Sequence, residues 1–461
     1  MNAVLNWFRT LPARYGRRTL IALALIAALG LVFRAVAVVH PVADPADDSH
    51  AYYALAKALY TEGSFGEPTF HQSSDWSPGA PWLYAGLFVV TGGPREGSIR
   101  ILEALMGVGT ILLVFFIGWR LGGRWPALIA ALGVAIYPPF IHSVGEVMSE
   151  PPAMLSLPAA VLAFLWAWDR TAAARNESAD GSGGGRSGVR AAWVWLVPGL
   201  LFGVTAMFRP EYTLVAGAFV IFAAVRWAWE REWRLGTAAV GLMLVALLLP
   251  IVPWTIRNLV VLERLVPIST GGGKALYVGT FYPADGEYQR VKAILYKRET
   301  GESLPPQSQA LNEVPPTPLF NKVADRYPEL PRDSALGKIG KQNFSKWFGE
   351  HPLGYLGMTV RKVGRMWSSG VGEFMDSGLG RAIQIVLVLL GIAGLVLLAL
   401  ARRWRETLCL AAPIVLVTVV GAVSLAAPRR NEILMTLIFP LAGLGLSAAA
   451  RALSSGRKWS H

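Results

Sequence analysis

A short polar segment near the amino terminus carries two adjacent carboxylates followed by aromatic residues, a combination suited to acid–base chemistry. Asp47 and Asp48 follow a proline-containing turn, and Tyr52 comes four residues after Asp48. From Asp48 onward apolar residues recur at helical spacing, which places the carboxylates at the start of a helix. A carboxylate in such a place can act as a general base toward a hydroxyl group. The alternative is that Asp48 only caps the helix.

Aromatic residues gather a little further along, between Ser74 and Tyr84. Trp82 and Tyr84 stand at the beginning of an apolar stretch, directly after Pro81. Their rings offer flat apolar faces on which a sugar can stack. They are equally compatible with an aromatic belt at the membrane–water interface.

Candidate ligands for a phosphate group occur at two later places. Arg257 stands beside Asn258, and an arginine binds phosphate through two parallel hydrogen bonds. Gly272 and Lys274 belong to a glycine-rich segment whose backbone allows close approach of an anion. That segment lacks the spacing of a P-loop, so nucleotide binding is not predicted. The alternative for Arg257 is an anchor that extends its charge to the interface.

Two further charged residues flank prolines. Glu150 precedes Pro151 at the start of an apolar run, where it either contacts an acceptor or a divalent ion, together with Glu146, or only complements the helix dipole. Arg209 is separated from Glu211 by one proline, which favours an ion pair or a substrate contact.

Metal and disulfide chemistry find no support in the sequence. The histidines do not show metal-ligand spacing, and Cys409 is the only cysteine. No metal or other cofactor is therefore predicted, with a divalent ion at Glu150 as the open alternative. An intramolecular disulfide is excluded.

The elements that hold these residues follow from composition. The chain of 461 residues is 53% hydrophobic and 16% charged, against about 25% charged in a typical soluble domain. A single soluble core cannot bury this much apolar surface, so an all-α polytopic membrane protein is predicted. The net charge of +13 lies in short clusters between apolar runs rather than on one face, which argues against nucleic-acid binding.

About ten apolar runs are long enough for the roughly 20 residues that a membrane span needs. They cover residues 19–39, 98–118, 125–143, 151–168, 191–208, 212–229, 235–254, 381–401, 407–427 and 432–450. The stretch 80–90 is apolar but too short, and it is interpreted as a half-helix.

The distribution of basic residues sets the orientation. With both termini inside, arginines such as Arg17, Arg120, Arg124 and Arg403 fall on the cytoplasmic side. Arg429 and the adjacent Arg430 are the noticeable exceptions, because they fall outside. We expect a multi-pass protein of the inner (plasma) membrane with its functional loops on the extracytoplasmic face.

Three regions are predicted along the chain. Residues 1–254 form an amino-terminal transmembrane module that includes a first outside loop at 41–97. Residues 255–380 form an extracytoplasmic region with amphipathic helices, among them 343–368 on the membrane surface. Residues 381–461 add the last transmembrane helices.

Several of these motifs together resemble the GT-C glycosyltransferases, and in particular the bacterial family 39 and ArnT-like enzymes related to protein O-mannosyltransferases. The resemblance rests on the order of the following segments: Asp48-x-x-x-Tyr52, Gly63–Gly66, Pro78–Trp82, Arg120–Arg124, Ser149–Pro151, Arg209–Glu211, Pro253–Asn258 and Val266–Gly273. It implies a GT-C-like fold, a polyprenyl-phosphate-sugar donor and inverting transfer to a glycan, glycolipid or protein acceptor. It also implies that Asp48 is the base, or Asp47 if the match is displaced by one position.

Two other classes of function compete with an enzyme. A transporter or flippase of a lipid-linked sugar would favour charges at the middle of the membrane, whereas the carboxylates here lie in predicted loops. A non-catalytic assembly subunit would keep the fold without the base.

Overall fold

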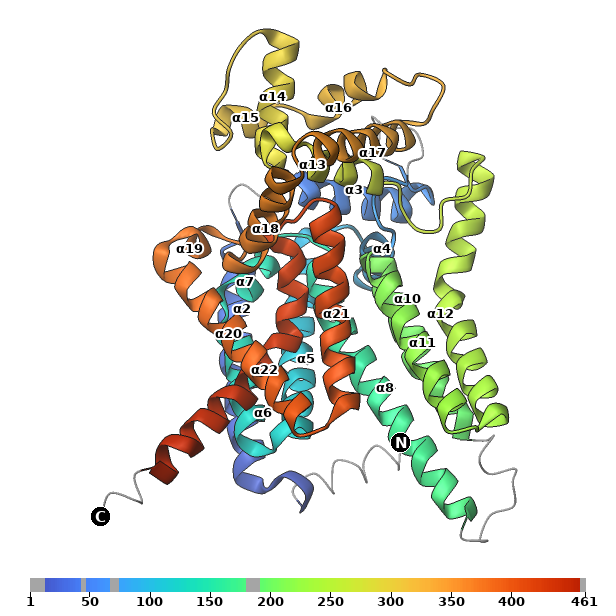
Figure 1. The fold of residues 1–461 in the computed structure, drawn as a ribbon, viewed down its shortest axis with the longest axis vertical. Helices are drawn as coiled ribbons and strands as arrows, with labels where there is room; N and C mark the ends of the chain where they lie inside the picture. The colour runs from blue at the N-terminus through green and yellow to red at the C-terminus, as the bar shows by residue number, and fades with distance from the viewer. Residues whose placement is uncertain (1–12, 43–46, 67–73, 180–190, 457–461) are drawn as a thin grey trace.

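The computed structural model describes residues 13–42, 47–66, 74–179 and 191–456, and every regular element within them is a helix. Long helices run side by side as a bundle, and shorter helices cover one end of it (Figure 1). We call this covered end the cap end. The opposite end carries Arg17, Arg120, Arg124 and Arg403, and we call it the basic end. The predicted all-α polytopic fold is confirmed.

Eight helices are long and apolar enough to cross a membrane. They are α2 (Arg17–Val39), α5 (Glu96–Gly122), α8 (Glu150–Ala179), α11 (Tyr212–Trp229), α12 (Trp233–Leu262), α20 (Gly378–Leu400), α21 (Trp404–Val423) and α22 (Pro428–Gly456). Each corresponds to one predicted span. The helix α12 continues past the predicted boundary at residue 254, so that Arg257 lies within it.

The two remaining predicted spans differ from simple helices. Residues 125–143 form α6 (Arg124–Ile136) and the short α7 (Pro138–His142), bent by 52° at their junction. Residues 191–208 form a 3₁₀ turn, η2 (Ala192–Trp195), followed by α10 (Leu196–Phe208), a shorter apolar run than the eight helices. Each of these two segments also runs from one end of the bundle toward the other (Figure 1). Arg17 and the end of α22 therefore lie at the same, basic end.

The first loop contributes two helices to the cap end, α3 (Asp47–Glu62) and α4 (Gly79–Thr91). The 13 residues of α4 extend about 20 Å, less than the ~30 Å of a hydrocarbon core. This helix is therefore too short to cross, as expected of the stretch 80–90. Gly79 lets its start pack directly on α10, because a Cβ there would lie 2.6 Å from the backbone of Met207.

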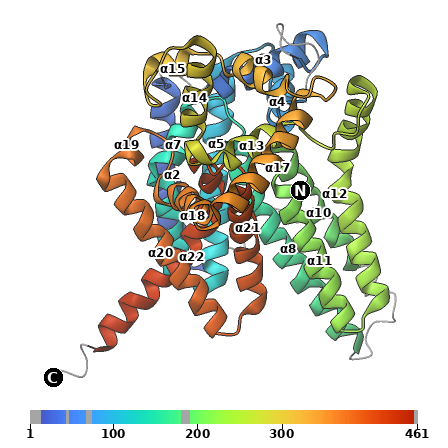
Figure 2. The same ribbon diagram turned by 45° about the horizontal axis from the view of Figure 1, so that its top comes forward.

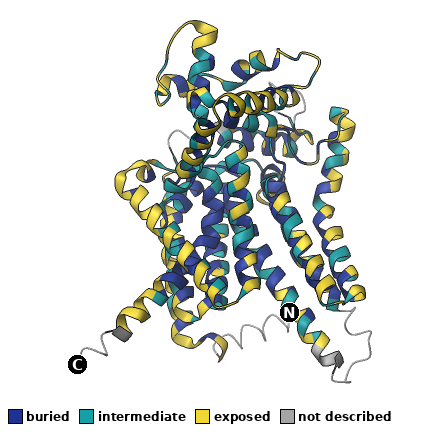
Figure 3. Cartoon of the chain, in the orientation of Figure 1, coloured by how far each residue is buried: buried dark blue, intermediate teal, exposed yellow. Residues whose placement is uncertain are grey.

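Small residues allow the central helices to approach closely. A Cβ on Gly118 of α5 would lie 2.8 Å from the backbone of Ala127 in α6, and one on Gly443 of α22 would lie 2.5 Å from the carbonyl oxygen of Pro126. Such contacts are typical of membrane helices, whose association is stabilised by dispersion between closely packed atoms rather than by removing apolar surface from water. Buried residues face the middle of the bundle, and exposed residues cover its outer helices (Figure 3).

The cap is a small helical layer with a hydrophobic core of its own, which includes Tyr277, Phe320 and Leu336. The helices of this region are α13 (Gly272–Thr280), η3 (Tyr282–Ala284), α14 (Tyr288–Thr300), α15 (Gln309–Glu313), α16 (Pro316–Ala324), α17 (Arg332–Glu350), α18 (Pro352–Ser368) and α19 (Glu373–Asp376). Figure 2 shows that this layer lies over the ends of the central helices. The proline-rich stretch around residue 315 is thus part of a packed layer.

A buried arginine stabilises the break between α6 and α7. Pro138 and Pro139 have no N–H groups, so the carbonyl oxygens four residues earlier, on Val134 and Ala135, lose their helical donors. Arg34 of α2 supplies both: its Nη2 donates to Val134 at 3.1 Å and its Nη1 to Ala135 at 3.3 Å. Arg34 is 1% exposed, and Gly107 leaves room for its side chain. This explains an intramembrane arginine without a catalytic role.

We therefore expect Arg34 and the two prolines to be energetically coupled. Arg34→Met should destabilise the protein more in the wild type than in the Pro138→Ala/Pro139→Ala background, by roughly 1–3 kcal/mol, because alanines restore the helical donors. Thermal unfolding of the four proteins in detergent measures this difference. Equal shifts in the two backgrounds would show that Arg34 does not act on these carbonyls.

Candidate active site at the cap end

The site is built around Asp48, which lies in the first turn of α3. A carboxylate is favourable there because it faces the positive end of the helix dipole. The Asp48 carboxylate forms an ion pair with the guanidinium of Arg429, in the first turn of α22. A cation at a helix amino terminus is unfavourable by itself, so this pair offsets the charge of Arg429. Asp47 is the first residue of α3, and its side chain lies outside the described part of the structure.

Three predicted site residues from distant segments meet beside this pair. The Tyr52 hydroxyl donates to Ser149 Oγ at 3.1 Å, and Ser149 Oγ donates to Glu150 Oε2 at 3.3 Å. Arg209 Nη1 lies 3.2 Å from Glu150 Oε1, and its Nε lies 3.3 Å from Glu211. The first loop, the start of α8 and the turn between α10 and α11 are thereby joined in one polar network.

The electrostatic environment of this network fixes the protonation states of Tyr52 and Arg209. Burial raises the pKa of Tyr52 well above its ordinary value, so the phenol remains a hydrogen-bond donor. Burial alone would lower the pKa of Arg209, but Glu211 and Glu150 raise it above its usual value. Arg209 is therefore a permanent cation held between two carboxylates.

The first turn of α22 supplies charges that sequence reasoning missed. Arg429 lies within electrostatic reach of Glu146 and Glu150 as well as Asp48, and Arg430 within reach of Glu211. The signal for them was present in the sequence, since Arg429 and Arg430 are basic residues in a short loop on the side whose other short loops carry few. Their carboxylate partners explain why they are tolerated there.

Polar contacts from α18 fix the start of α22. Asn431 Nδ2 donates to the carbonyl oxygens of Met366 and, at 2.8 Å, Ser369. The buried Lys362 ammonium donates to Gly279 at 2.7 Å and to Ser424, just before α22, at 3.0 Å. Burial lowers the pKa of Lys362 to about 8. The surface helix α18 thus holds the turn that presents Arg429 to Asp48.

The predicted aromatic pair is divided between two environments. Tyr84 is fully buried, and its hydroxyl donates to Glu103 Oε1 at 2.6 Å and to the carbonyl oxygen of Met148. Trp82 is 42% exposed and packs edge-on against Trp254. Trp76 instead contacts the ring of Tyr52, with centroids 5.3 Å apart, and lies nearer the polar network.

Arg257 and Asn258 belong to a second group at the end of α12. Buried Asn258 donates to Val266 at 2.9 Å and so fastens the chain that follows the helix. Arg257 donates to Asn258 Oδ1 at 3.0 Å and to the carbonyl oxygen of Phe65 at 3.1 Å, and its guanidinium lies over the ring of Trp254. These contacts connect α12 to the first loop.

Gly272 and Lys274 form part of a third group, where α13 begins. The backbone N–H groups of Gly273 and Lys274 donate to Asp333 Oδ1 at 2.8 and 3.2 Å, so an internal carboxylate already occupies this helix terminus. The Lys274 ammonium lies over the rings of Tyr288 and Phe320. Gly273 permits close contact with Asp333, because a Cβ at position 273 would overlap the backbone of Asp333.

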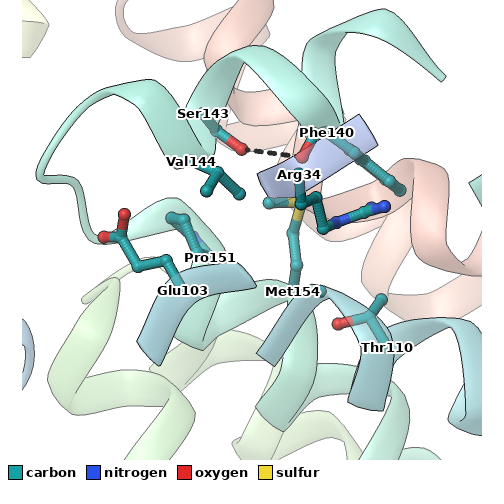
Figure 4. A pocket seen from close by; sticks show the side chains of 9 residues that line it. Arg34, Glu103, Thr110, Phe140, Ser143, Val144, Pro151 and Met154 are labelled. Atoms are coloured by element: carbon teal, nitrogen blue, oxygen red, sulfur yellow. Dashed lines mark hydrogen bonds between the residues drawn. The ribbon is translucent and has the colours of Figure 1, made fainter. Parts of the chain in front are cut away.

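A small cavity of about 10 Å³ lies between Arg34 and Glu103 (Figure 4). It has room for about one water molecule and is far too small for a sugar. Among the described residues, no group of three His, Cys, Asp or Glu side chains is arranged to hold a metal ion.

Comparison with known structures defines the class of the fold. The chain matches archaeal oligosaccharyltransferase AglB from Archaeoglobus fulgidus, in complex with an inhibitory peptide and a dolichol-phosphate, with a TM-score of 0.55 and 12% identity. The match covers 96% of this chain and 51% of AglB, so the chain spans about half the length of that relative. ArnT from Cupriavidus metallidurans, bound to undecaprenyl phosphate, matches with a TM-score of 0.41, 13% identity, and coverage of 94% of this chain and 78% of ArnT. The fold is that of the GT-C glycosyltransferases.

A family model matches one part of the chain. A family model described as dolichyl-phosphate-mannose-protein mannosyltransferase matches residues 75–175, which begin before α4 and extend through most of α8. This agrees with the resemblance to enzymes related to protein O-mannosyltransferases, which is confirmed. No curated protein matches the chain significantly.

Proposed function

We propose that the chain is a membrane glycosyltransferase that transfers a sugar from a polyprenyl-phosphate-linked donor to an acceptor hydroxyl with inversion. The observation that carries the proposal is the network of Asp48, Arg429, Glu150 and Arg209 at the cap end of a GT-C fold. The matched family is named for a dolichyl-phosphate-linked mannose, and the AglB structure holds a dolichol-phosphate, which supports a polyprenyl-phosphate donor.

The proposed reaction needs one base and one group of cations. Asp48 takes the proton of the acceptor hydroxyl as that oxygen attacks the anomeric carbon. The bond from this carbon to the phosphate oxygen breaks at the same time, and the polyprenyl phosphate leaves with the electron pair. A phosphate leaving group needs little protonation, so guanidinium groups near Asp48 suffice to stabilise its charge.

Arg429 and Arg257 are the two candidates for the phosphate contact. Arg429 lies against the proposed base, whereas Arg257 lies in the group at the end of α12. A donor whose lipid tail runs along α12 would reach Arg257 first, and a donor bound beside Asp48 would reach Arg429.

The conservative variant Arg257→Lys separates these arrangements. If Arg257 binds the donor phosphate, we expect the KM for the donor to rise about tenfold, because an ammonium cannot reproduce the two parallel hydrogen bonds. Steady-state transfer kinetics with a labelled donor measure this change. Unchanged kinetics would leave Arg257 as the link between α12 and the first loop, and would favour Arg429.

We place the cap end on the extracytoplasmic face of the plasma membrane, because the short loops at the other end are rich in basic residues and short loops are the ones that set orientation. In a Cys409→Ser background, Gln307→Cys in the cap should react with an impermeant maleimide on intact cells. Arg402→Cys, in the turn between α20 and α21, should react only after permeabilisation. The reverse pattern would place Asp48 on the cytoplasmic face and refute this orientation.

The proposed activity is tested by incubating the purified chain with a radiolabelled polyprenyl-phosphate sugar and an extract of envelope acceptors. We expect label to appear in the acceptor while polyprenyl phosphate is released in equal amount. Label that stays on the donor would refute a glycosyltransferase.

A further inference from the structure

The helices α6 and α22 touch and then separate toward the basic end, leaving a groove of about 460 Å³. The two helices meet where Gly443 of α22 packs against the backbone of Pro126 in α6. Gly122, the last residue of α5, contacts the side chain of Leu444 beside them. Beyond that contact, α22 leaves the bundle at an angle (Figure 1). The groove is therefore a wedge whose closed end is fixed by glycine contacts.

The walls of the wedge are apolar and its mouth is cationic. Pro126, Ile129 and Leu446 line it, with Trp125 from α6 and Arg451 from the last turns of α22. The guanidinium of Arg124 lies 4.5 Å from the centroid of the Trp125 ring. In addition, α6 begins at Arg124 without a side-chain cap, so its amino-terminal N–H groups and dipole add positive potential.

The depth of the mouth follows from the length of α22. Arg451 is 22 residues beyond Arg429, or about 33 Å along a helix. This is close to the ~30 Å thickness of a hydrocarbon core. Arg429 lies at the cap end, so Arg451 lies toward the leaflet at the basic end, on the side of that leaflet's headgroup phosphates. Because α22 leaves the bundle at an angle (Figure 1), the depth between the two arginines is less than the path along the helix.

We propose that this wedge binds an anionic phospholipid from the leaflet at the basic end. One acyl chain lies between α6 and α22, and the headgroup phosphate contacts Arg451 and Arg124. Two guanidinium groups and a helix terminus at one mouth favour an anionic over a zwitterionic headgroup. They disfavour a second copy of the chain, because a symmetric contact would bring like charges together. This site is independent of the proposed sugar transfer.

Trp125 provides a direct readout. Full-length protein, stripped of lipid in detergent, is titrated with phosphatidylglycerol that carries brominated acyl chains, which quench nearby tryptophan. The Trp125 signal is the difference between the wild type and Trp125→Phe. We expect saturable quenching, with Arg451→Gln raising the half-quenching concentration about tenfold, equivalent to about 1.4 kcal/mol. Arg124→Gln serves as a second variant with the same expected direction.

Arg234→Gln is the matched control, since Arg234 is an exposed arginine in the first turn of α12 at the same end. It should leave the titration unchanged. Equal quenching by brominated phosphatidylcholine would overturn the preference for an anionic headgroup. Half-quenching concentrations equal to that of the wild type in both Arg451→Gln and Arg124→Gln would overturn the proposed site. A dimer in light scattering that dissociates in Arg451→Gln would assign the wedge to a second copy instead.

Discussion

Asp48→Asn is expected to slow sugar transfer by about 10²–10⁴-fold, or roughly 3–5 kcal/mol of barrier, because general-base assistance is worth this much. Asparagine keeps the shape of the side chain and a polar group in the first turn of α3, but it cannot take the acceptor proton. The variant therefore distinguishes catalysis from a structural role at the start of α3. The measurement is the initial rate of label transfer at saturating donor, together with the KM for the donor, which should change little.

Two neighbouring variants make this result specific. Asp47→Asn should cost less, because Asp48 is the carboxylate paired with Arg429. Glu150→Gln should also cost less in rate, because Glu150 is engaged by Arg209 and Ser149. An inactive Asp47→Asn with an active Asp48→Asn would move the base by one position. Full activity in both aspartate variants would remove the first loop from the chemistry.

Arg429→Gln is expected to lower transfer by about 10²-fold, which is typical when one preorganised donor is removed from a site that stabilises developing charge. Arg429→Lys should recover part of the loss, since it restores the charge without the guanidinium fork. The rates of both variants are compared with that of Arg361→Gln, an exposed arginine that pairs with Asp285 in the cap. The Arg361 variant should transfer at the wild-type rate.

The double variant Asp48→Asn/Arg429→Gln identifies how Arg429 acts. If Arg429 only orients Asp48, its removal should cost nothing further once Asp48 is replaced. If Arg429 also binds the donor phosphate, the double variant should transfer sugar more slowly than Asp48→Asn and should show a higher KM for the donor. Wild-type kinetics in Arg429→Gln would exclude both roles.

The bundle could be predicted from the sequence because a membrane span needs a long apolar run, a signal that does not depend on tertiary contacts. The bend after Ile136 was not predicted, since the run continues on both sides of the prolines and its partner, Arg34, is about a hundred residues away. The continuation of α12 past Trp254 was missed because the predicted span was bounded by its apolar run, which is interrupted by Thr255, Arg257 and Asn258. The guanidinium of Arg257 lies over the Trp254 ring, one helical turn earlier in α12.

Only part of the candidate site could be predicted from the sequence. Asp48, Tyr52, Glu150 and Arg209 come from separate segments, and the structure brings them together in one network. The contribution of Arg429 depends on the position of α22 relative to α3, which no local pattern specifies. The glycines near Lys274 resembled a phosphate cradle, yet the adjacent amide groups bind Asp333, a contact that depends on the packing of α13 against α17.

The most direct test of the proposed transferase combines native mass spectrometry with a single incubation. Wild-type protein and Asp48→Asn are each loaded with a polyprenyl-phosphate sugar and given acceptor. We predict that the wild type converts its bound donor to polyprenyl phosphate and labels the acceptor, while Asp48→Asn retains the intact donor. Intact donor on the wild type, or equal conversion by both proteins, would contradict Asp48-dependent sugar transfer at the cap end.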